Sequence, residues 1–437
     1  MKDWYILYRD ILYLHFSEGF YNLPESAKNA ASPRNPFLRV GRMAGYTLVR
    51  LFGNLFQPVE EPGKLHGKVW LYVVSQNNYD SLHFLQEAIP DAVMVAGQSK
   101  AIGRYNKVVA RLSLRKKLLY YYKFLPLFFR FLSHRNQSTL RFVDLLYDAI
   151  GFYEVYLQKL KKHRPQAIVF ANDHNADARA MLLAAKDLGI KTVYIQHSSI
   201  SQLFPPLSYD LNLLEGRDAL DKYRQCGPIS GKIEFIGMPK ADKYVKVRNH
   251  HPTVQIIGIA CNLMDSLEEV ETLLQSITLA FTSLRIIVRP HPRDQRSYAF
   301  AKRISPSISL SDVRQQSVFE YLQELDMLVS GNSGIHLEAV LLNVWSVYYN
   351  FNPKEELYDY YGFVKNGLID VADSFAGLQP MLELGIAQKP DVYLRAKYYS
   401  ATVGTSYDGK SSELAVQHLK SFLGMAEAVE NKPLPLQ

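Results

Sequence analysis

Cysteine is scarce in this sequence: Cys226 and Cys261 are the only two among 437 residues. Because neither belongs to a CxxC pair, the chain has no disulfide framework, and its cysteine content fits a reducing compartment. Long apolar runs are missing as well, since no stretch of 18 apolar residues occurs, and Asp3, Arg9 and Asp10 interrupt the start where a signal peptide needs apolar residues. We therefore expect a cytoplasmic protein without a transmembrane helix.

Several motifs of common enzymes are also missing. The chain contains no Walker A and no GxGxxG sequence, which argues against ATP and dinucleotide chemistry. No D-x-D follows a predicted strand, and no His, Cys and Asp residues stand at metal-ligand spacing. The pair His250–His251 lies in a charged linker, where two solvated side chains are the simpler interpretation. We expect no metal site, and no cofactor besides a cosubstrate.

Acidic residues are absent from 92 to 143. The same segment contains eleven basic residues among many aromatic ones: Lys100, Arg104, Lys107, Arg111, Arg115, Lys116, Lys117, Lys123, Arg130, Arg135 and Arg141. A basic segment of this kind can bind nucleic acid. Because it is as apolar as it is basic and no nucleic-acid module surrounds it, we expect no nucleic acid partner.

Three of these bases recur every seven residues: Lys116, Lys123 and Arg130. This spacing predicts one basic helical face, with a kink at Pro126. An aromatic, basic helix suits an anionic membrane surface, and the segment 36–56 has a similar composition. A core helix with a solvated basic edge is the open alternative.

The rest of the chain predicts an α/β protein, because short apolar runs alternate with helical segments and so indicate doubly wound parallel sheets. Its length suits two lobes. Strands are predicted at 69–75, 92–96, 167–173, 191–197, 209–216, 232–239, 254–262, 284–292, 325–334 and 344–350. We expect an N-terminal helical extension (1–66), a Rossmann-like acceptor lobe (67–238) with a basic and aromatic helical insert (100–162), a linker (239–253), a Rossmann-like donor lobe (254–411) and a C-terminal helix and tail (412–437).

The strongest motif is RPHPRD, which directly follows the predicted strand LRIIV. Two prolines hold His291 in a rigid turn at the carboxyl end of a strand, where doubly wound sheets bind ligands. An imidazole there can donate a hydrogen bond to a phosphate oxygen, and Arg289, Pro292 and Arg293 belong to the same turn. A structural histidine in a tight turn is the alternative.

The second motif is SGNSGIHLEA, where a predicted strand ends before a helix. The backbone amides and hydroxyls of Ser330, Gly331, Ser333 and Gly334 can bind a phosphate. Glu338, one turn into the helix, can accept hydrogen bonds from a ribose. The alternative is a serine that caps the helix and an exposed glutamate.

Together these two motifs resemble the C-terminal lobe of bacterial cell-surface glycosyltransferases of the GT-B superfamily, including CDP-glycerol glycerophosphotransferases, polysialyltransferases and capsule and lipopolysaccharide glycosyltransferases. The resemblance covers about Val254 to Phe351 well and the first lobe loosely. It implies two Rossmann-like lobes with a cleft between them and a nucleotide-sugar donor. It also implies that His291 with Pro292 and the pair Ser330 and Ser333 contact donor phosphates, and that Glu338 contacts the ribose.

Two positions in the first lobe are candidates for the catalytic base. Asp173 ends a predicted strand with His174 beside it, and a carboxylate there can deprotonate an acceptor hydroxyl, although Asp173 or Asn175 could equally cap the next helix. His197 lies in a QHSS segment that resembles the QHG of many of these enzymes, with Ser198 in place of the glycine. His197 could instead be merely packed at a strand end. Asp173 is slightly favoured for an inverting enzyme.

Weaker candidates complete the predicted site. Asn77, Asn78 and Tyr79 follow the first strand and are expected on the acceptor side with His174 and Ser198. Lys410, in a polar loop before the last helix, is expected near the donor.

The expected function is metal-independent transfer of a sugar or related unit from a nucleotide-activated donor to a glycan or lipid-linked glycan acceptor. The product would be a bacterial capsule, an O-antigen of lipopolysaccharide or a teichoic-acid-like polymer, and glycosyl transfer is favoured over glycerophosphate transfer. The expected location is the inner face of the cytoplasmic membrane, as a peripheral protein. Two alternatives stay open: a nucleotide-sugar epimerase of the same architecture, and a basic protein that binds nucleic acid or membranes.

Overall fold

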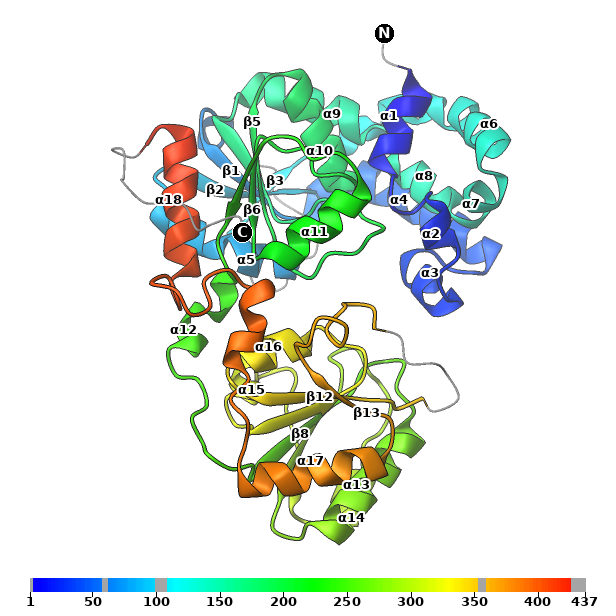
Figure 1. Cartoon of the computed structure of the whole chain (residues 1–437). Helices are drawn as coiled ribbons and strands as arrows, with labels where there is room; N and C mark the ends of the chain where they lie inside the picture. The colour runs from blue at the N-terminus through cyan, green and yellow to red at the C-terminus, as the bar shows by residue number, and fades with distance from the viewer. Residues whose placement is uncertain (1–2, 57–61, 99–107, 353–358, 426–437) are drawn as a thin grey trace. The chain divides into compact units, whose positions relative to one another are not determined.

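The chain forms two compact units in the computed structural model, which describes residues 3–56, 62–98, 108–352 and 359–425 (Figure 1). Unit 1 comprises Met1–Leu214, Ala219–Phe235 and Ala415–Gln437, and unit 2 comprises Glu215–Asp218 and Ile236–Leu414. Each unit contains one parallel sheet with helices around it. The predicted α/β class is therefore confirmed.

Unit 1 is built on a seven-stranded sheet in the order β3-β2-β1-β4-β5-β6-β7. Its strands are β1 (Val69–Tyr72), β2 (Ala92–Gly97), β3 (Ala110–Leu112), β4 (Ala167–Phe170), β5 (Lys191–Ile195), β6 (Leu211–Leu214) and β7 (Lys232–Phe235). All neighbours pair in parallel, with Val69 opposite both Ala92 and Ala167. The central strands are buried along their whole length, which explains why they read as continuous apolar runs.

The helices of unit 1 include an N-terminal group that confirms the predicted helical extension. They are α1 (Trp4–Ile11), α2 (Glu18–Tyr21), α3 (Glu25–Ala31), α4 (Pro36–Phe56), η1 (Pro62–Lys64), α5 (Gln76–Ala88), η3 (Arg115–Lys123), α6 (Phe124–His134), α7 (Asn136–Arg141), α8 (Val143–Ala149), α9 (Phe152–His163), α10 (Ala176–Asp187), α11 (Arg217–Cys226) and α18 (Ser411–Leu423). Helix α10 begins at the cap Asn175, and just after its end Gly189 has a φ of 64°, as predicted for a glycine that terminates a helix.

The predicted basic face of the insert is wrong. The segment is not one kinked helix: strand β3 precedes it, η3 ends at Lys123, and Pro126 lies in the first turn of α6, where a missing N–H breaks no helical bond. Lys116 is exposed, but Lys123 is buried and its Nζ lies 2.5 Å from Glu154 Oε1. An acidic partner from a later helix therefore holds Lys123 inside unit 1. Lys100, Arg104 and Lys107 lie outside the described residues.

Unit 2 is built on a six-stranded sheet in the order β10-β9-β8-β11-β12-β13, again with all neighbours parallel. Its strands are β8 (Ile256–Ala260), β9 (Arg285–Arg289), β10 (Ile308–Leu310), β11 (Met327–Ser330), β12 (Trp345–Tyr349) and β13 (Asp370–Ala372). Its helices are η4 (Pro239–Ala241), α12 (Asp242–Val245), α13 (Leu267–Ala280), α14 (Phe300–Ile304), α15 (Val318–Leu322), α16 (Ile335–Leu341), α17 (Phe375–Ala387) and η5 (Tyr393–Tyr398). The predicted linker thus begins with two short helices.

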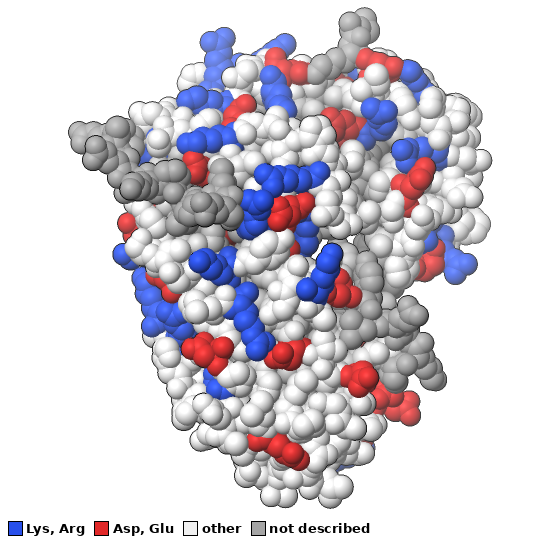
Figure 2. Space-filling model, viewed as in Figure 1, with Lys and Arg blue, Asp and Glu red and all other residues white. Residues whose placement is uncertain are grey.

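Basic and acidic side chains are interspersed on the face drawn in Figure 2, although the whole chain has a net charge of +8. Within the described ranges, no helix is both long enough and apolar enough to cross a membrane.

Candidate functional site

The carboxyl ends of three neighbouring strands bring the two predicted donor motifs together in unit 2. In this sheet β8 lies between β9 and β11, and the chain turns outward from β8 in both directions. Ligands of doubly wound sheets bind at such a switch point, beyond the carboxyl ends of the strands. The loops after β8, β9 and β11, which contain Asn262, His291 and Ser333, therefore form the candidate donor site.

His291 is held in a defined tautomer by its own turn. The backbone N–H of Arg293 donates to His291 Nδ1 over 3.1 Å, so Nδ1 is the acceptor and Nε2 carries the proton in the neutral ring. Burial and the nearby Arg293 lower the pKa of His291 below its usual value. At neutral pH the side chain is therefore a neutral Nε2–H donor.

The other residues of this turn differ in their exposure. The guanidinium of Arg289 is buried, where it donates to Ser311 Oγ (2.5 Å) and to the Gln316 carbonyl (2.9 Å). The expectation that Arg289 contributes to an anion site is therefore corrected: these two bonds turn its charge into the unit. Pro292 and Arg293 are exposed, which leaves Arg293 as the basic side chain of the turn that faces solvent.

The two serines of the loop after β11 differ in burial and in their hydrogen bonds. Ser330 is buried and its hydroxyl donates to the Ala260 carbonyl over 2.8 Å, which corrects its predicted phosphate contact. Ser333 is partly exposed and accepts a bond from the Ile335 N–H over 3.4 Å. The predicted serine pair is thus one structural hydroxyl and one accessible hydroxyl.

The glycines of this loop also differ. A β-carbon at Gly331 would stand 2.8 Å from Asp265 Oδ1, too close for any side chain without a shift. Gly334 has an ordinary right-handed backbone and space around it. Gly331 is therefore required by packing, whereas Gly334 tolerates a methyl group. Helix α16, which follows, has only seven residues.

His336, which was not among the predicted site residues, holds the β11 loop in place through a buried hydrogen bond. Its Nε2 lies 2.8 Å from the Gly331 carbonyl, which can only accept, so Nε2 is protonated and Nδ1 accepts the Ser346 hydroxyl over 2.6 Å. Burial lowers the pKa of His336 to about 4, which keeps the ring neutral. A histidine flanked by the apolar residues Ile335 and Leu337 was the available signal.

The loop after β8 was also missed. Asn262 and Asp265 close a turn in which the Asn262 N–H donates to Asp265 Oδ2 (2.8 Å). Arg296 donates to the carbonyls of both residues (2.9 and 2.6 Å) while its Nη2 lies 2.6 Å from Asp294 Oδ2. The β9 and β8 loops are therefore joined by one guanidinium. Burial raises the pKa of Asp265 to about 6.

The carboxylate of Glu338 forms an ion pair with a lysine from another element. Lys240 Nζ lies 2.6 Å from Glu338 Oε1. Burial would lower the pKa of Lys240, but the carboxylates of Glu338 and Glu215 outweigh it and raise that pKa. Burial also raises the pKa of Glu215 to about 8, although Lys240 opposes this. Glu215 and Lys240 were missed because they are far from Glu338 in sequence. Lys410, the predicted donor contact, is exposed immediately before α18.

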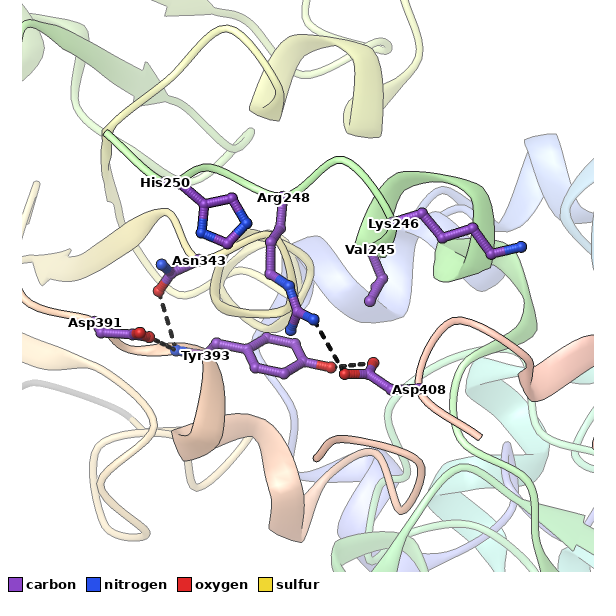
Figure 3. Close-up of a pocket in the computed structure, with 8 residues that line it drawn as sticks. All are labelled: Val245, Lys246, Arg248, His250, Asn343, Asp391, Tyr393 and Asp408. Carbon is purple, nitrogen blue, oxygen red and sulfur yellow. Dashed lines mark hydrogen bonds and ion pairs between the residues drawn. The ribbon is translucent and has the colours of Figure 1, made fainter. Parts of the chain in front are cut away.

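A cavity of about 360 Å³ in the same unit lies at the opposite ends of the strands from the candidate donor site (Figure 3). Asn343, on its wall, comes two residues before β12 begins, and so belongs to the amino ends of the strands. The guanidinium of Arg248 lies 3.8 Å from the centre of the Tyr393 ring and its Nη2 lies 3.2 Å from Asp408 Oδ2. These contacts fasten the predicted linker to the C-terminal part of unit 2. The cavity is therefore separate from the donor site.

The switch point of unit 1 lies between β1 and β4 and brings Asp173 and His174 to the sheet edge. Asp173 is buried; its Oδ1 lies 2.9 Å from His174 Nδ1 and its Oδ2 accepts the Tyr223 hydroxyl over 2.5 Å. Burial would raise the pKa of Asp173, but these hydrogen bonds and the charge of His197 outweigh it, so the pKa lies below its usual value. Asp173 is therefore an ionised carboxylate that orients His174.

His174 takes the exposed position of this pair. Its side chain keeps 25% of its surface and its ring stacks on Phe204, with the centroids 4.4 Å apart. With Nδ1–H directed at Asp173, the neutral ring presents the lone pair of Nε2. The predicted helix cap is Asn175, not Asp173. His197 lies partly exposed after β5, and Ser198 is exposed with its carbonyl accepting from Gln196.

The three residues expected to line the acceptor side after β1 form the first turn of α5, and the expectation is corrected for Asn78 and Tyr79, whose side chains are buried. Asn78 is buried and its Nδ2 donates to the Ala171 carbonyl over 3.2 Å, joining the β1 and β4 loops. Tyr79 is buried and Asn77 is exposed. Ser75 caps the N-terminus of α5, so these residues form a helix where a loop was expected.

No family model matches this chain, and no curated protein matches its sequence. Solved structures are similar in fold at low identity. A putative UDP-N-acetylglucosamine 2-epimerase from Listeria monocytogenes has a TM-score of 0.55 and 11% identity, covering 84% of this chain and 99% of its own. The UDP-GlcNAc 2-epimerase from Neisseria meningitidis, solved with UDP-GlcNAc bound, has a TM-score of 0.54 and 12% identity over 81% of this chain and 100% of its own.

A third similar structure is the wall teichoic acid polymerase TagF, solved as a variant after a soak with CDPG. It has a TM-score of 0.51 and 10% identity, and the match covers 89% of this chain and 98% of that one. The two parallel sheets and these similarities agree with the resemblance to GT-B enzymes. The chain has the two-lobed α/β fold of the GT-B type, shared with UDP-GlcNAc 2-epimerases and with TagF.

Proposed function

We propose that this chain is a metal-independent glycosyltransferase that moves a sugar or related unit from a nucleotide-activated donor to a glycan or lipid-linked glycan of the bacterial surface. The observation that carries the proposal is the neutral His291, whose Nε2–H donor stands at the switch point of unit 2. Nucleotide phosphates bind at this place in doubly wound folds, and a neutral donor there stabilises a phosphate without a metal ion.

Unit 2 binds the donor in this proposal. His291 Nε2–H, the Ser333 hydroxyl and the Arg293 side chain bind the phosphates, with the backbone of Gly331 and Gly334 beside them. Glu338 accepts hydrogen bonds from the ribose while Lys240 holds its carboxylate in place. Lys410 is a further donor contact in this proposal.

Unit 1 supplies the base. In an inverting transfer, His174 Nε2 takes the proton of an acceptor hydroxyl, whose oxygen forms a bond to the anomeric carbon. The bond from that carbon to the donor phosphate breaks, and His291 donates a hydrogen bond to the departing oxygen. Asp173 stabilises the imidazolium that forms on His174, and thus positions the base instead of acting as one. His197, which lies partly exposed after β5, is the second candidate base.

Two similar structures guide the choice of donor for the test. The names of the solved structures mention UDP-GlcNAc and CDPG, so UDP, CDP, CMP and GDP and their sugars form a short list of candidates. A thermal-shift measurement with each nucleotide identifies the nucleobase that the protein prefers, because a ligand at 100 times its dissociation constant stabilises the folded protein by about 2.7 kcal/mol. His291→Ala should abolish that shift, whereas His66→Ala, an exposed histidine of unit 1, should retain it. A full shift in His291→Ala refutes the donor site.

A nucleotide-sugar epimerase is the second candidate, favoured by the fold similarity to two such enzymes. Incubation of the protein with the donor alone separates the two functions. If the chain is an epimerase, nuclear magnetic resonance will detect an epimer of the donor. If it is a transferase, the donor will stay unchanged until an acceptor is added, and will then be consumed.

The acceptor is proposed to reach the enzyme at the inner face of the cytoplasmic membrane, where the protein binds as a peripheral enzyme. The growing polymer would be a capsule, an O-antigen or a teichoic-acid-like chain. Transfer of radiolabel from the identified donor to lipid-extracted or polymeric material from membranes tests this assignment.

A further inference from the structure

Helix α4 carries its hydrophobic residues on the outside. Phe37 keeps 83% of its surface exposed and Leu55 keeps 78%. The outward apolar residues of this helix are Phe37, Leu38, Val40, Leu48, Val49, Leu51, Phe52 and Leu55. A surface helix of a soluble protein normally turns such residues toward the core and its charges toward water. Helix α4 has the reverse arrangement.

The arginines of α4 point into unit 1. Arg50 is buried with its Nη2 3.2 Å from Asp148 Oδ1, and Arg42 Nη1 lies 3.1 Å from Oδ2 of the buried Asp144. Arg39 donates to the Arg141 carbonyl over 2.8 Å. Because these three guanidinium groups bond to later helices of unit 1, the opposite, apolar side of α4 faces outward.

The adjoining segment η3–α6 repeats this inversion. Lys117 is fully buried with its Nζ 3.5 Å from Asp148 Oδ1, and Lys123 is paired with Glu154. The outward apolar residues here are Leu119, Tyr122, Leu125 and Phe129. Helix α4 packs against η3, which itself packs against α6. We call the outward residues of α4 and η3–α6 together the apolar face.

The two stretches that supply the apolar face contain charged residues of one sign. No acidic residue occurs in 26–59 or in 92–143, the two stretches that supply it. Arg34, Arg115 and Lys116 are exposed within those stretches. An apolar surface flanked by bases complements the acyl chains and the anionic headgroups of a bilayer.

We propose that the apolar face of unit 1 inserts into the interface of a bilayer that contains anionic lipid. A second copy of the chain fits less well, because a contact between two apolar faces would bring two surfaces with basic residues and no acidic partners from these stretches together. The proposal does not depend on the transferase activity. Its test uses neither donor nor acceptor, so its failure would overturn the proposed membrane location and leave the proposed transfer reaction intact.

Vesicle co-sedimentation of the full chain tests the proposal directly. The probes are vesicles of phosphatidylcholine with 30% phosphatidylglycerol and vesicles of phosphatidylcholine alone. The variant Leu48→Ser/Phe52→Ser/Leu55→Ser removes three outward side chains of α4. The matched control, Val247→Ser/Leu279→Ser/Leu394→Ser, removes three apolar side chains of unit 2 that are 62–86% exposed, against 49–78% for the α4 set.

The wild-type protein and the control should bind the anionic vesicles, and the α4 variant should lose at least tenfold in affinity. Because all three α4 residues are exposed, circular dichroism and the Tm should stay unchanged. Binding of the α4 variant as tight as that of the wild type overturns the proposal. So does a wild-type dimer that binds no vesicles and dissociates in the α4 variant, since the occupant would then be a second copy.

The depth of insertion gives a gain-of-signal test. Phe52→Trp places a fluorophore on the apolar face, and Leu279→Trp places one on unit 2. Brominated lipids should quench the added fluorescence of Phe52→Trp, above the background of the three native tryptophans, and leave Leu279→Trp unquenched. Equal quenching of the two variants contradicts the proposal.

The headgroup contribution is tested by Arg34→Gln/Arg115→Gln/Lys116→Gln. Each lost base near an anionic surface should lower the affinity roughly fivefold and reduce its dependence on salt. An unchanged preference for anionic over neutral vesicles would refute the role of these bases.

Discussion

The carboxylate of Asp265 occupies the space beside Gly331: its Oδ1 lies 2.8 Å from the position of a β-carbon there. The β8 loop thus shapes the β11 loop through direct contact. Gly331→Ala has to displace the Asp265 side chain, whose Oδ2 accepts the Asn262 N–H, so we expect a loss of about 1–3 kcal/mol in stability and weaker nucleotide binding. Denaturant unfolding and thermal shift measure both.

Gly334→Ala is the matched control for that change, because its backbone is right-handed and its surroundings are open. It should unfold and bind nucleotide like the wild type. Equal behaviour of the two alanine variants would show that the loop is not constrained by Asp265.

Ser330 and Ser333 should behave differently when they are changed to alanine. Ser330→Ala removes a buried hydrogen bond to the Ala260 carbonyl and should cost about 1 kcal/mol of stability. Ser333→Ala should leave the free energy of unfolding unchanged and raise the Kd of the nucleotide. Urea denaturation and calorimetry separate the two effects; a Ser330→Ala variant of normal stability would refute the structural role.

His174→Ala should reduce kcat by about 10²–10⁴ if its Nε2 is the base, since that is the typical contribution of a positioned base. Asp173→Asn should reduce kcat as well, because the amide no longer stabilises the imidazolium. Neither change should affect donor binding, which we assign to unit 2. A rate that falls only in His197→Ala would move the base to His197.

Glu215 should make the protein less stable as the pH rises. Burial raises its folded-state pKa to about 8, so between an unfolded pKa near 4.5 and that value the folded chain holds a proton that the unfolded chain has lost. Stability should fall across this interval, by roughly 3–5 kcal/mol in total, and level off above it. Glu215→Gln lacks this titration.

The measurement is the free energy of unfolding of wild type and Glu215→Gln at pH 5 and pH 8. The variant should gain on the wild type at pH 8. A constant difference between the two proteins at both values would show that Glu215 ionises in the folded chain as it does in the unfolded one.

The sheets could be predicted from sequence because buried parallel strands are continuous apolar runs. The strands that were missed, Ala110–Leu112, Ile308–Leu310 and Asp370–Ala372, are three-residue edge strands with too little pattern to detect. The position of His291 was predictable because it depends on local sequence: the two prolines that hold its turn are its direct neighbours in the chain.

The use of each side chain was harder to predict, because it depends on partners far along the chain. Lys123 meets Glu154, 31 residues away, and Ser330 meets the Ala260 carbonyl, 70 residues away. Periodicity assigned Lys123 to a surface, and the SGNSG motif assigned Ser330 to a ligand. In the folded chain they are already committed to hydrogen bonds.

Helix α18 makes unit 1 a discontinuous domain. Leu419 is buried, and Lys191 Nζ donates to the Phe422 carbonyl over 3.1 Å, so this last helix completes the lobe that begins at the other end of the chain. Cutting the gene after Phe235 would therefore yield a fragment with an uncovered core. A separately expressed first lobe needs a fusion that joins Phe235 to Ala415 through a short linker. Proteolytic release of unit 2 would likewise require more than one cleavage.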